Sequence, residues 1–222
     1  MFNEGVGKNG YHKTWYSSRD WRSYRNILSL VIAHSEPGPI LDVGAGCGFI
    51  VEGAVRWGIS CKGIDGSAEA VAIARERYPE MDIRQHLLSD PMPFSDQSFQ
   101  TVIINQVIEH LEPEVARRVL KETCRVLRPG GMLAVTSPCK YNKYEKEVDP
   151  THINLYSPGE LSDLLVECGF AKVIPINSAL HLLGGNRLAA YIMNTLWKMT
   201  KWDRWSATAN ALAYKSKGLT EL

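Results

Sequence analysis

Three glycines at alternate positions, Gly44, Gly46 and Gly48, lie between an apolar run and a run of residues with helical spacing. Glycine tolerates positive φ and lets the backbone pass close beneath a ligand, and the first turn of a helix offers unpaired N–H groups. A dinucleotide-binding turn of the form GxGxxG needs a third glycine at position 49, where this chain has phenylalanine. The spacing therefore predicts a ligand-binding turn of another kind.

Two aspartates near this turn indicate what it binds. Asp42, just ahead of the glycines, would repel a pyrophosphate and would attract an ammonium or sulfonium group. Asp65, 21 residues after Gly44, ends a predicted strand, where an acidic side chain can accept both hydroxyls of a ribose. A nucleoside with a positive charge and no phosphate describes S-adenosylmethionine, which we expect to be the ligand.

Two histidines follow predicted strands and could take a proton from a hydroxyl group. His110 lies in the segment IEHLEP after the fourth strand, and His152 lies in DPTHINLY after the fifth. Imidazole suits this task because its pKa lies near neutrality. Asp149 could orient His152. We therefore expect His110 and His152 to be catalytic, and a structural or ligand-enclosing role is the alternative.

The elements that must position these residues alternate between short apolar runs and helical patterns, which predicts βαβ units around a parallel sheet. The predicted strands cover residues 40–43, 60–65, 82–87, 101–106, 132–137 and 172–177. The predicted helices cover residues 49–57, 68–77, 114–127 and 158–168. The last helix should begin with a capping box, because Ser157 precedes Pro158 and Glu160 follows three residues after the serine.

Further segments flank the predicted sheet. Residues 17–34 predict an N-terminal helix, residues 186–199 predict an amphipathic helix, and residues 207–217 contain a final strand. We expect one domain over residues 1–222, in which helix 17–34 and a helical insertion at 180–205 form the lid or bind the substrate.

The composition narrows the class of protein. The 222 residues are 45% hydrophobic and 22% charged, as in an ordinary globular domain. The sequence has neither an apolar run of membrane-spanning length nor a recognisable signal peptide. Its five cysteines include no CxxC pair, which argues against a disulfide framework or a structural zinc site. We expect a cytoplasmic protein.

Positive charge gathers near both ends of the chain, although the net charge is only +1. Such segments could meet a phosphate, an anionic lipid or the acidic remainder of the protein. The late amphipathic helix, together with Trp197, Trp202 and Trp205, could also dock on a membrane surface or a lipid-like substrate. Core packing or a dimer contact is the alternative for these tryptophans.

The chain resembles the class I S-adenosylmethionine-dependent methyltransferases of the small-molecule type from about residue 39 to residue 173. Five segments carry this resemblance: LDVGAGCG, GIDGS, PFSDQSFQTVIINQVIEHL, VLRPGGMLAVTSP and HINLYSPGELSDLLVECGF. Gln100 departs from the aspartate that the family often has after the phenylalanine. The resemblance implies an α/β, Rossmann-like fold whose seven-stranded, mostly parallel sheet has an antiparallel last strand and helices on both faces.

The resemblance also implies how S-adenosylmethionine is held as the cofactor. Asp42 would orient its amino group, Asp65 would hold its ribose, and the backbone at Asn105 would contact its ammonium. The adenine is expected after the third strand, where the segment HLLSDP offers Leu87, Leu88 or Asp90, and Leu88 is taken as the candidate. The implied cofactor-binding residues are Asp42, Gly44, Ala45, Gly46, Gly48, Asp65, Gly66, Leu88 and Asn105.

A metal site is an alternative that the same resemblance raises. The segment QVIEH is similar to the E-x-x-E-H metal motif of small-RNA 2′-O-methyltransferases and some quinone O-methyltransferases, with His152 as a further ligand. Gln106 replaces the first glutamate of that motif, so one charged ligand is lost. For this reason we predict no metal ligand.

These features predict an enzyme that transfers a methyl group from S-adenosylmethionine to a small molecule, at a hydroxyl oxygen, in a quinone, glycan, lipid or secondary-metabolite pathway. Methylation at nitrogen or carbon stays open. A nucleic-acid methyltransferase is disfavoured, because the Asp/Asn-Pro-Pro-aromatic signature of amino-directed DNA methyltransferases is absent. A non-catalytic S-adenosylmethionine-binding module is the other alternative, and the sequence leaves the oligomeric state open.

Overall fold

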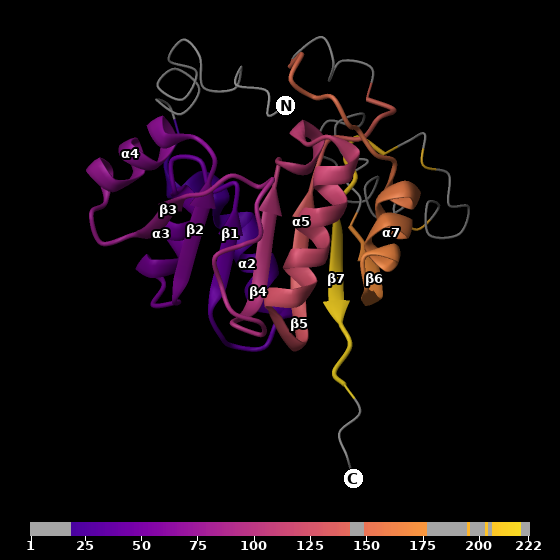
Figure 1. Cartoon of the computed structure of the whole chain (residues 1–222), viewed down its shortest axis with the longest axis horizontal. Helices are drawn as coiled ribbons and strands as arrows, with labels where there is room; N and C mark the ends of the chain where they lie inside the picture. Colours follow the sequence, from indigo (N-terminus) through magenta and orange to yellow (C-terminus); the bar gives the residue numbers. More distant parts are fainter. Residues whose placement is uncertain (1–18, 143–148, 177–194, 196–202, 204–205, 219–222) are drawn as a thin grey trace.

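The computed structural model of the chain describes residues 19–142, 149–176, 195, 203 and 206–218. Within these residues, seven strands form one sheet in the order β3-β2-β1-β4-β5-β7-β6 (Figure 1). The strands are β1 (Ile40–Val43), β2 (Cys61–Asp65), β3 (Asp82–Gln85), β4 (Phe99–Asn105), β5 (Leu127–Thr136), β6 (Phe170–Pro175) and β7 (Ala211–Lys215). Neighbours from β3 to β5 pair in parallel, whereas β7 runs antiparallel to β5 and β6. The predicted sheet is therefore confirmed.

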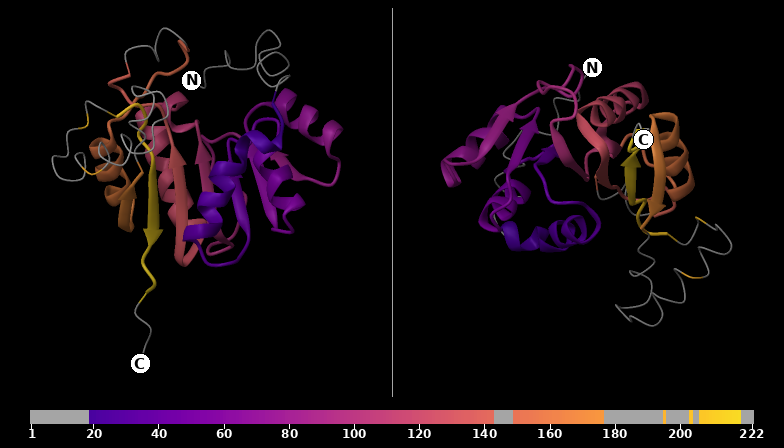
Figure 2. Two further views of the ribbon diagram at one scale, coloured as in Figure 1. Left: turned by 180° about the vertical axis from the view of Figure 1, so that it is seen from behind. Right: turned by 90° about the horizontal axis from the view of Figure 1, so that it is seen from below.

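Helices cover both faces of this sheet, as Figure 2 shows. One face carries α2 (Arg25–His34), α3 (Phe49–Arg56) and α4 (Ala68–Arg77), and the other carries α5 (Pro113–Val126) and α7 (Pro158–Glu167). Successive strand residues face opposite sides of a sheet. In β4, Ile103 accordingly packs in the core beneath α2 and α3, whereas Val102 and Ile104 pack in the core beneath α5 and α7.

The starts of two helices follow from local sequence. Ser157 Oγ accepts a hydrogen bond from the Glu160 N–H, and Glu160 Oε2 accepts one from the Ser157 N–H, which confirms the predicted capping box. The N-terminal helix begins as a 3-10 turn, η2 (Trp21–Tyr24), which Asp20 caps by accepting from the Arg22 N–H. Residues 17 and 18 of the predicted helix lie outside the described part of the chain.

Three strands, β4, β5 and β6, begin earlier than the sequence predicts, and β6 does so by two residues. Phe99 pairs with Leu127 ahead of a shift in register, so β4 and β5 both extend toward the N-terminus of the chain. The residues after Leu127 read Arg-Pro-Gly-Gly, which is typical of a turn. The sequence therefore does not indicate that β5 has already begun at Leu127. The predicted final strand is confirmed as β7.

The predicted helix at 186–199, and nearly all of the insertion at 180–205, lie outside the described residues. Their roles as a lid or a docking surface therefore stay predictions. Among the described helices, none combines the length and the apolar character needed to cross a membrane.

Candidate active site

The candidate site lies where the strand order of the sheet reverses. The chain runs from β1 outward through β2 and β3, and then returns to β4 on the other side of β1. In open α/β sheets, ligands bind in the crevice at such a reversal, outside the carboxyl ends of the strands. The glycine turn follows β1 at this edge, and the segment that contains Glu109 and His110 follows β4.

The glycine turn is held tightly between β1 and β2. The N–H groups of Gly44 and Ala45 both donate to the Ile64 carbonyl, at 2.8 and 3.0 Å. Gly44, Gly46 and Gly48 have φ values of 74°, 53° and 75°, a region that side chains disfavour. These backbone angles explain why glycine occupies the three alternate positions.

Asp65 fixes the turn from the end of β2. Its Oδ2 accepts a hydrogen bond from the Gly46 N–H at 2.7 Å, and its Oδ1 accepts one from the Ser67 N–H at 2.8 Å. A carboxylate can accept about four hydrogen bonds, so a ligand can share it with the turn. Asp65 therefore organises the loop in addition to its predicted contact with a ribose.

Asp42 is buried at the end of β1. Its side chain is 2% exposed, and its Oδ2 has no hydrogen-bond partner among the described residues. Burial, together with the charge of Asp65, raises the pKa of Asp42 to about 8. An unpartnered buried carboxyl is costly, and a positively charged ligand group would stabilise it.

An aromatic and cationic cluster braces the turn from the helices. The Tyr24 ring stacks on the Phe49 ring, with centroids 5.7 Å apart, and the Arg77 guanidinium lies 3.9 Å from the Phe49 centroid. Arg77 also donates to the Cys47 carbonyl at 2.7 Å and pairs with the buried Glu52. The only local signal for this cluster is Phe49 itself, which stands where a dinucleotide-binding turn has glycine.

The carboxyl end of β4 contains an unusual backbone conformation. Gln106 has φ of 56°, although it is not glycine, and its N–H donates to the Thr136 carbonyl at 3.0 Å. Thr136 Oγ1 donates to Asn105 Oδ1 at 2.8 Å and accepts from Gln106 Nε2 at 3.3 Å. Strained residues of this kind cluster at functional sites. The sequence does not predict this strain, because glutamine carries no signal for positive φ.

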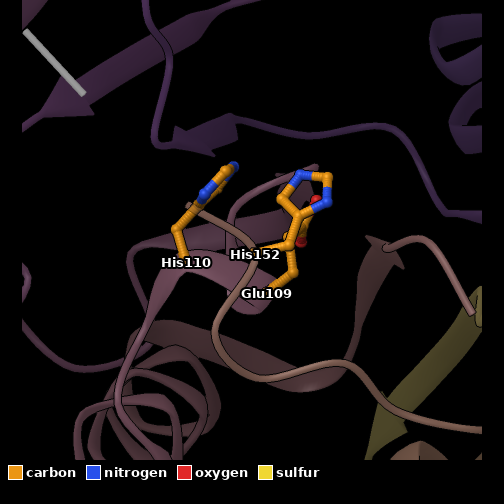
Figure 3. A group of neighbouring side chains, drawn as sticks. All are labelled: Glu109, His110 and His152. Carbon is orange, nitrogen blue, oxygen red and sulfur yellow. The ribbon is translucent and has the colours of Figure 1, made fainter. Parts of the chain in front are cut away.

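The two predicted catalytic histidines lie side by side, next to Glu109 (Figure 3). Their ring centroids are 4.8 Å apart, and Glu109 is fully buried beside them. His110 ends the short helix η3 (Ile108–His110), and His152 comes from the segment after β5. The N–H groups of Ile153 and Asn154 both donate to the Glu109 carbonyl at 3.0 Å, and these bonds join the two segments.

The hydrogen bonds around His110 decide which ring nitrogen carries the proton. The single hydroxyl proton of Thr151 is donated to Asp149 Oδ1. His110 Nδ1 lies 3.0 Å from that hydroxyl oxygen and 3.2 Å from the Thr151 carbonyl, so Nδ1 must be the donor. The lone pair is therefore on Nε2. Burial lowers the pKa of both histidines, and His110 lowers that of His152 further, so both rings are neutral at pH 7.

Comparisons with known proteins agree with this geometry. Residues 41–135 match a protein family described as Methyltransferase domain. The chain is 31% identical over 154 residues to a probable S-adenosylmethionine-dependent methyltransferase of Mycolicibacterium smegmatis, with 68% of this chain and 59% of that protein covered. It is 36% identical over 100 residues to a demethylmenaquinone methyltransferase of Chlorobaculum parvum, with 45% and 40% covered. The chain contains a class I S-adenosylmethionine-dependent methyltransferase domain.

A solved structure supports the same assignment of the fold. The crystal structure of a SAM-dependent methyltransferase from Archaeoglobus fulgidus superposes with a TM-score of 0.70 at 17% identity, and the match covers 92% of this chain and all of that one. The chain spans 59% and 40% of the lengths of the two relatives named above. The match to these relatives therefore does not establish the activity or the substrate of the whole protein.

The residues present fit S-adenosylmethionine, the cofactor of this domain class. The buried and unpartnered Asp42 Oδ2 offers an acceptor to an ammonium group, and Asp65 adjoins the turn that would lie beneath the ligand. Ala45 belongs to the same turn, and Gly66 and Asn105 lie at the ends of β2 and β4. Their individual contacts with the cofactor stay predictions.

Leu88, which is predicted to contact the adenine, is buried, whereas its neighbour Leu87 is exposed. Leu88 is 5% exposed and packs in the core with Met92, whereas Leu87 is 44% exposed. A Cβ atom at Gly66 would lie 3.7 Å from Leu87 Cδ2. Only the backbone of Leu88 is therefore suited to a ligand at this edge, and the exposed Leu87, which the sequence also offers, is the better candidate for apolar contact with the adenine.

The raised pKa of Asp42 predicts that this methyltransferase domain releases protons when it binds its cofactor. At pH 7 the carboxyl is protonated before binding, and a cationic ligand favours the carboxylate, so about one proton should be released per S-adenosylmethionine bound. Calorimetric titrations in buffers with different ionisation enthalpies measure this number. The dependence on buffer should vanish in Asp42→Asn and persist in Asp82→Asn, whose carboxylate pairs with Lys62 and Arg84. Equal heats in all buffers would contradict the raised pKa.

Proposed function

We propose that this protein transfers a methyl group from S-adenosylmethionine to a hydroxyl oxygen of a small-molecule acceptor. The observation that carries the proposal is the pair of adjacent, neutral histidines in the segments that follow β4 and β5, next to the reversal of the strand order. A hydroxyl is a weak nucleophile until it loses its proton, and a neutral imidazole at this position suits that step. The glycine turn after β1 would hold the methyl donor on the neighbouring strand end.

The roles of the residues follow from their contacts. His110 and His152 would act on the acceptor hydroxyl, and Thr151 would keep the His110 lone pair on Nε2. Asp149 accepts from both the N–H and the hydroxyl of Thr151, so it would hold that threonine in place. The bound cofactor supplies the methyl group on a sulfonium leaving group. Most of the remaining catalysis would come from holding the acceptor oxygen in line with that methyl group.

A small and partly apolar acceptor is supported by two observations. The similarity to a demethylmenaquinone methyltransferase suggests an acceptor related to quinones. Ile153, which follows His152 directly, is 44% exposed and could contact an aromatic ring. Contact with a membrane or a lipid-like substrate rests on residues 186–205, most of which lie outside the described part, and stays a prediction.

A screen of acceptors tests the proposal. Reduced quinones, catechols, glycans and hydroxylated lipids would be incubated with the protein and S-adenosylmethionine, and S-adenosylhomocysteine would be measured. Each active acceptor would be paired with its O-methylated counterpart, which should be inert. The product should carry a new methoxy group in its NMR spectrum. Methylation at carbon or nitrogen, or turnover with RNA alone, would contradict the proposal.

With an active acceptor, the histidines can be tested individually. His110→Ala and His152→Ala should each lower kcat by about 100-fold, because each removes a group that ionises the acceptor. The dissociation constant of S-adenosylmethionine should change by less than about threefold, since neither residue belongs to the glycine turn. His34→Ala is the matched control, because His34 is exposed at the end of α2, where its Nδ1 lies 2.9 Å from the Leu30 carbonyl oxygen of the same helix. Unchanged kcat in both active-site variants would exclude them from catalysis.

A further inference from the structure

We propose that Glu109, His110 and His152 bind one divalent transition-metal ion, contrary to the prediction from the sequence that no residue is a metal ligand. One ligand atom from each of these three side chains lies within 4.8 Å of the other two. Figure 3 shows the side chains rising on the same side of the backbone, with the Glu109 carboxylate next to the His152 ring. The binding of the ion is independent of the proposed function, and only its role in methyl transfer rests on that function.

The chemistry of the three ligands selects the class of ion. Two imidazoles and one carboxylate suit zinc, iron, cobalt or manganese in the divalent state, whereas magnesium and calcium prefer oxygen ligands. Three protein ligands also leave coordination positions open for a substrate oxygen, as in catalytic zinc sites. Glu109 is fully buried, and a carboxylate in such surroundings is suited to a positive partner.

The ligands are held in place by the backbone. His110 adjoins Glu109 in η3, and His152 comes from a segment far along the chain. The two hydrogen bonds from the Ile153 and Asn154 N–H groups to the Glu109 carbonyl fasten that segment to η3. The site is therefore preorganised by main-chain bonds that do not involve the ligand atoms themselves.

The surroundings of His110 also resemble those of a metal-binding histidine. Histidines that bind metals usually donate their other ring N–H to a carbonyl or carboxylate, which orients the ring. His110 Nδ1 donates to Thr151, so Nε2 presents its lone pair for coordination. Asp149 fixes Thr151 and also places its Oδ2 3.8 Å from His152 Nε2.

In methyl transfer the ion would act as a Lewis acid, and the histidines would affect the acceptor through it. The acceptor oxygen would coordinate the ion, which lowers the pKa of the hydroxyl, and the O–H proton would pass to solvent. The oxygen would then form a bond to the methyl carbon. The bond between sulfur and that carbon would break, and sulfur would keep the electron pair and leave as a neutral thioether.

Cobalt binding tests the site directly. Tag-free protein freed of metal with a chelator would be titrated with Co²⁺ and, separately, with Mn²⁺ and Zn²⁺. We expect one Co²⁺ per chain, with a visible absorption band, and binding about 100-fold weaker in Glu109→Gln and His152→Ala. Glu114→Gln, an exposed change of the same kind on α5, should bind as the parent does. Affinity for S-adenosylmethionine would be measured in every variant to show that it is folded.

Thr151 provides a second test that leaves all three ligands intact. Thr151→Val removes the hydroxyl, the nearer of the two oxygens that accept from His110 Nδ1, and leaves the carbonyl, so Co²⁺ should bind about tenfold more weakly, whereas Thr151→Ser should bind normally. The proposal is overturned if parent protein that binds S-adenosylmethionine binds none of the three ions. It is also overturned if the Glu109 and His152 variants bind them as well as the parent.

The two proposals can fail separately. Binding of one ion with no methylation of any hydroxyl would support the metal site and contradict the proposed function. Methylation of a hydroxyl by protein that contains no ion would support the function and contradict the role of the ion.

Discussion

Replacement of Asp65 by alanine is expected to weaken the binding of S-adenosylmethionine by about 10³-fold. The change removes a charged acceptor from the ribose hydroxyls, and each hydrogen bond to a charged group contributes about 1.5–3 kcal/mol. It also releases the Gly46 and Ser67 N–H groups, which Asp65 holds at 2.7 and 2.8 Å. The turn would then lose its fixed shape as well as its ligand contact.

Calorimetric titration with S-adenosylmethionine and, separately, with NAD measures this effect. Asp82→Ala is the matched control, because it removes the same charge from the start of the neighbouring strand β3, where Asp82 pairs with Lys62 and Arg84. The dissociation constant of S-adenosylmethionine for Asp82→Ala should stay within about twofold of that of the parent, since Asp82 lies away from the carboxyl edge of the sheet. NAD should bind neither protein. A similar affinity in Asp65→Ala and the parent would place the cofactor elsewhere.

The parts of this site that can be predicted from the sequence are those with a local signal. Gly44, Gly46 and Gly48 identify the turn because few other residues adopt positive φ. Asp42 and Asp65 are recognisable because Asp42 lies just ahead of the glycines and Asp65 ends a predicted strand, and parallel strands bring their carboxyl ends to one edge. Predicting the strands therefore also places the two aspartates near the turn.

The remaining parts depend on contacts between distant segments. Tyr24 and Arg77 meet at Phe49 only because η2 and α4 lie on the same face of the sheet as α3. The positive φ of Gln106 has no signal in its residue type. The proximity of Glu109 and His152 depends on backbone hydrogen bonds after β5, whose formation no periodic pattern indicates.

The fold and the site are linked at the reversal of the strand order. β1 provides the turn and Asp42, while β4 leads through Gln106 into the segment with Glu109 and His110. Val107 lies between these two groups and packs against Gly44. Tight packing across the reversal would hold the cofactor side and the acceptor side of the crevice at a fixed separation, which in-line methyl transfer requires.

That packing makes Gly44→Ala the substitution with the largest expected effect on stability. A Cβ at Gly44 would lie 2.3 Å from Val107 Cγ2, and the residue has φ of +74°. Positive φ costs about 1–2 kcal/mol in a residue with a side chain, and overpacking costs about 1–3 kcal/mol more, so the free energy of unfolding should fall by about 4 kcal/mol. Denaturant unfolding measures this loss.

Gly58 separates the cost of positive φ from the cost of overpacking. Its φ is +76°, but a Cβ atom there would have no contact within 4 Å among the described residues, its chain neighbours aside. Gly58→Ala should therefore cost only about 1–2 kcal/mol, the contribution of the backbone alone. In the Gly44→Ala background, Val107→Ala should recover about 2 kcal/mol in a double-mutant cycle, since it removes both Cγ atoms that clash. Equal losses at Gly44 and Gly58 would mean that the turn moves freely relative to Val107. The crevice would then lack the rigid spacing on which the proposed methyl transfer depends.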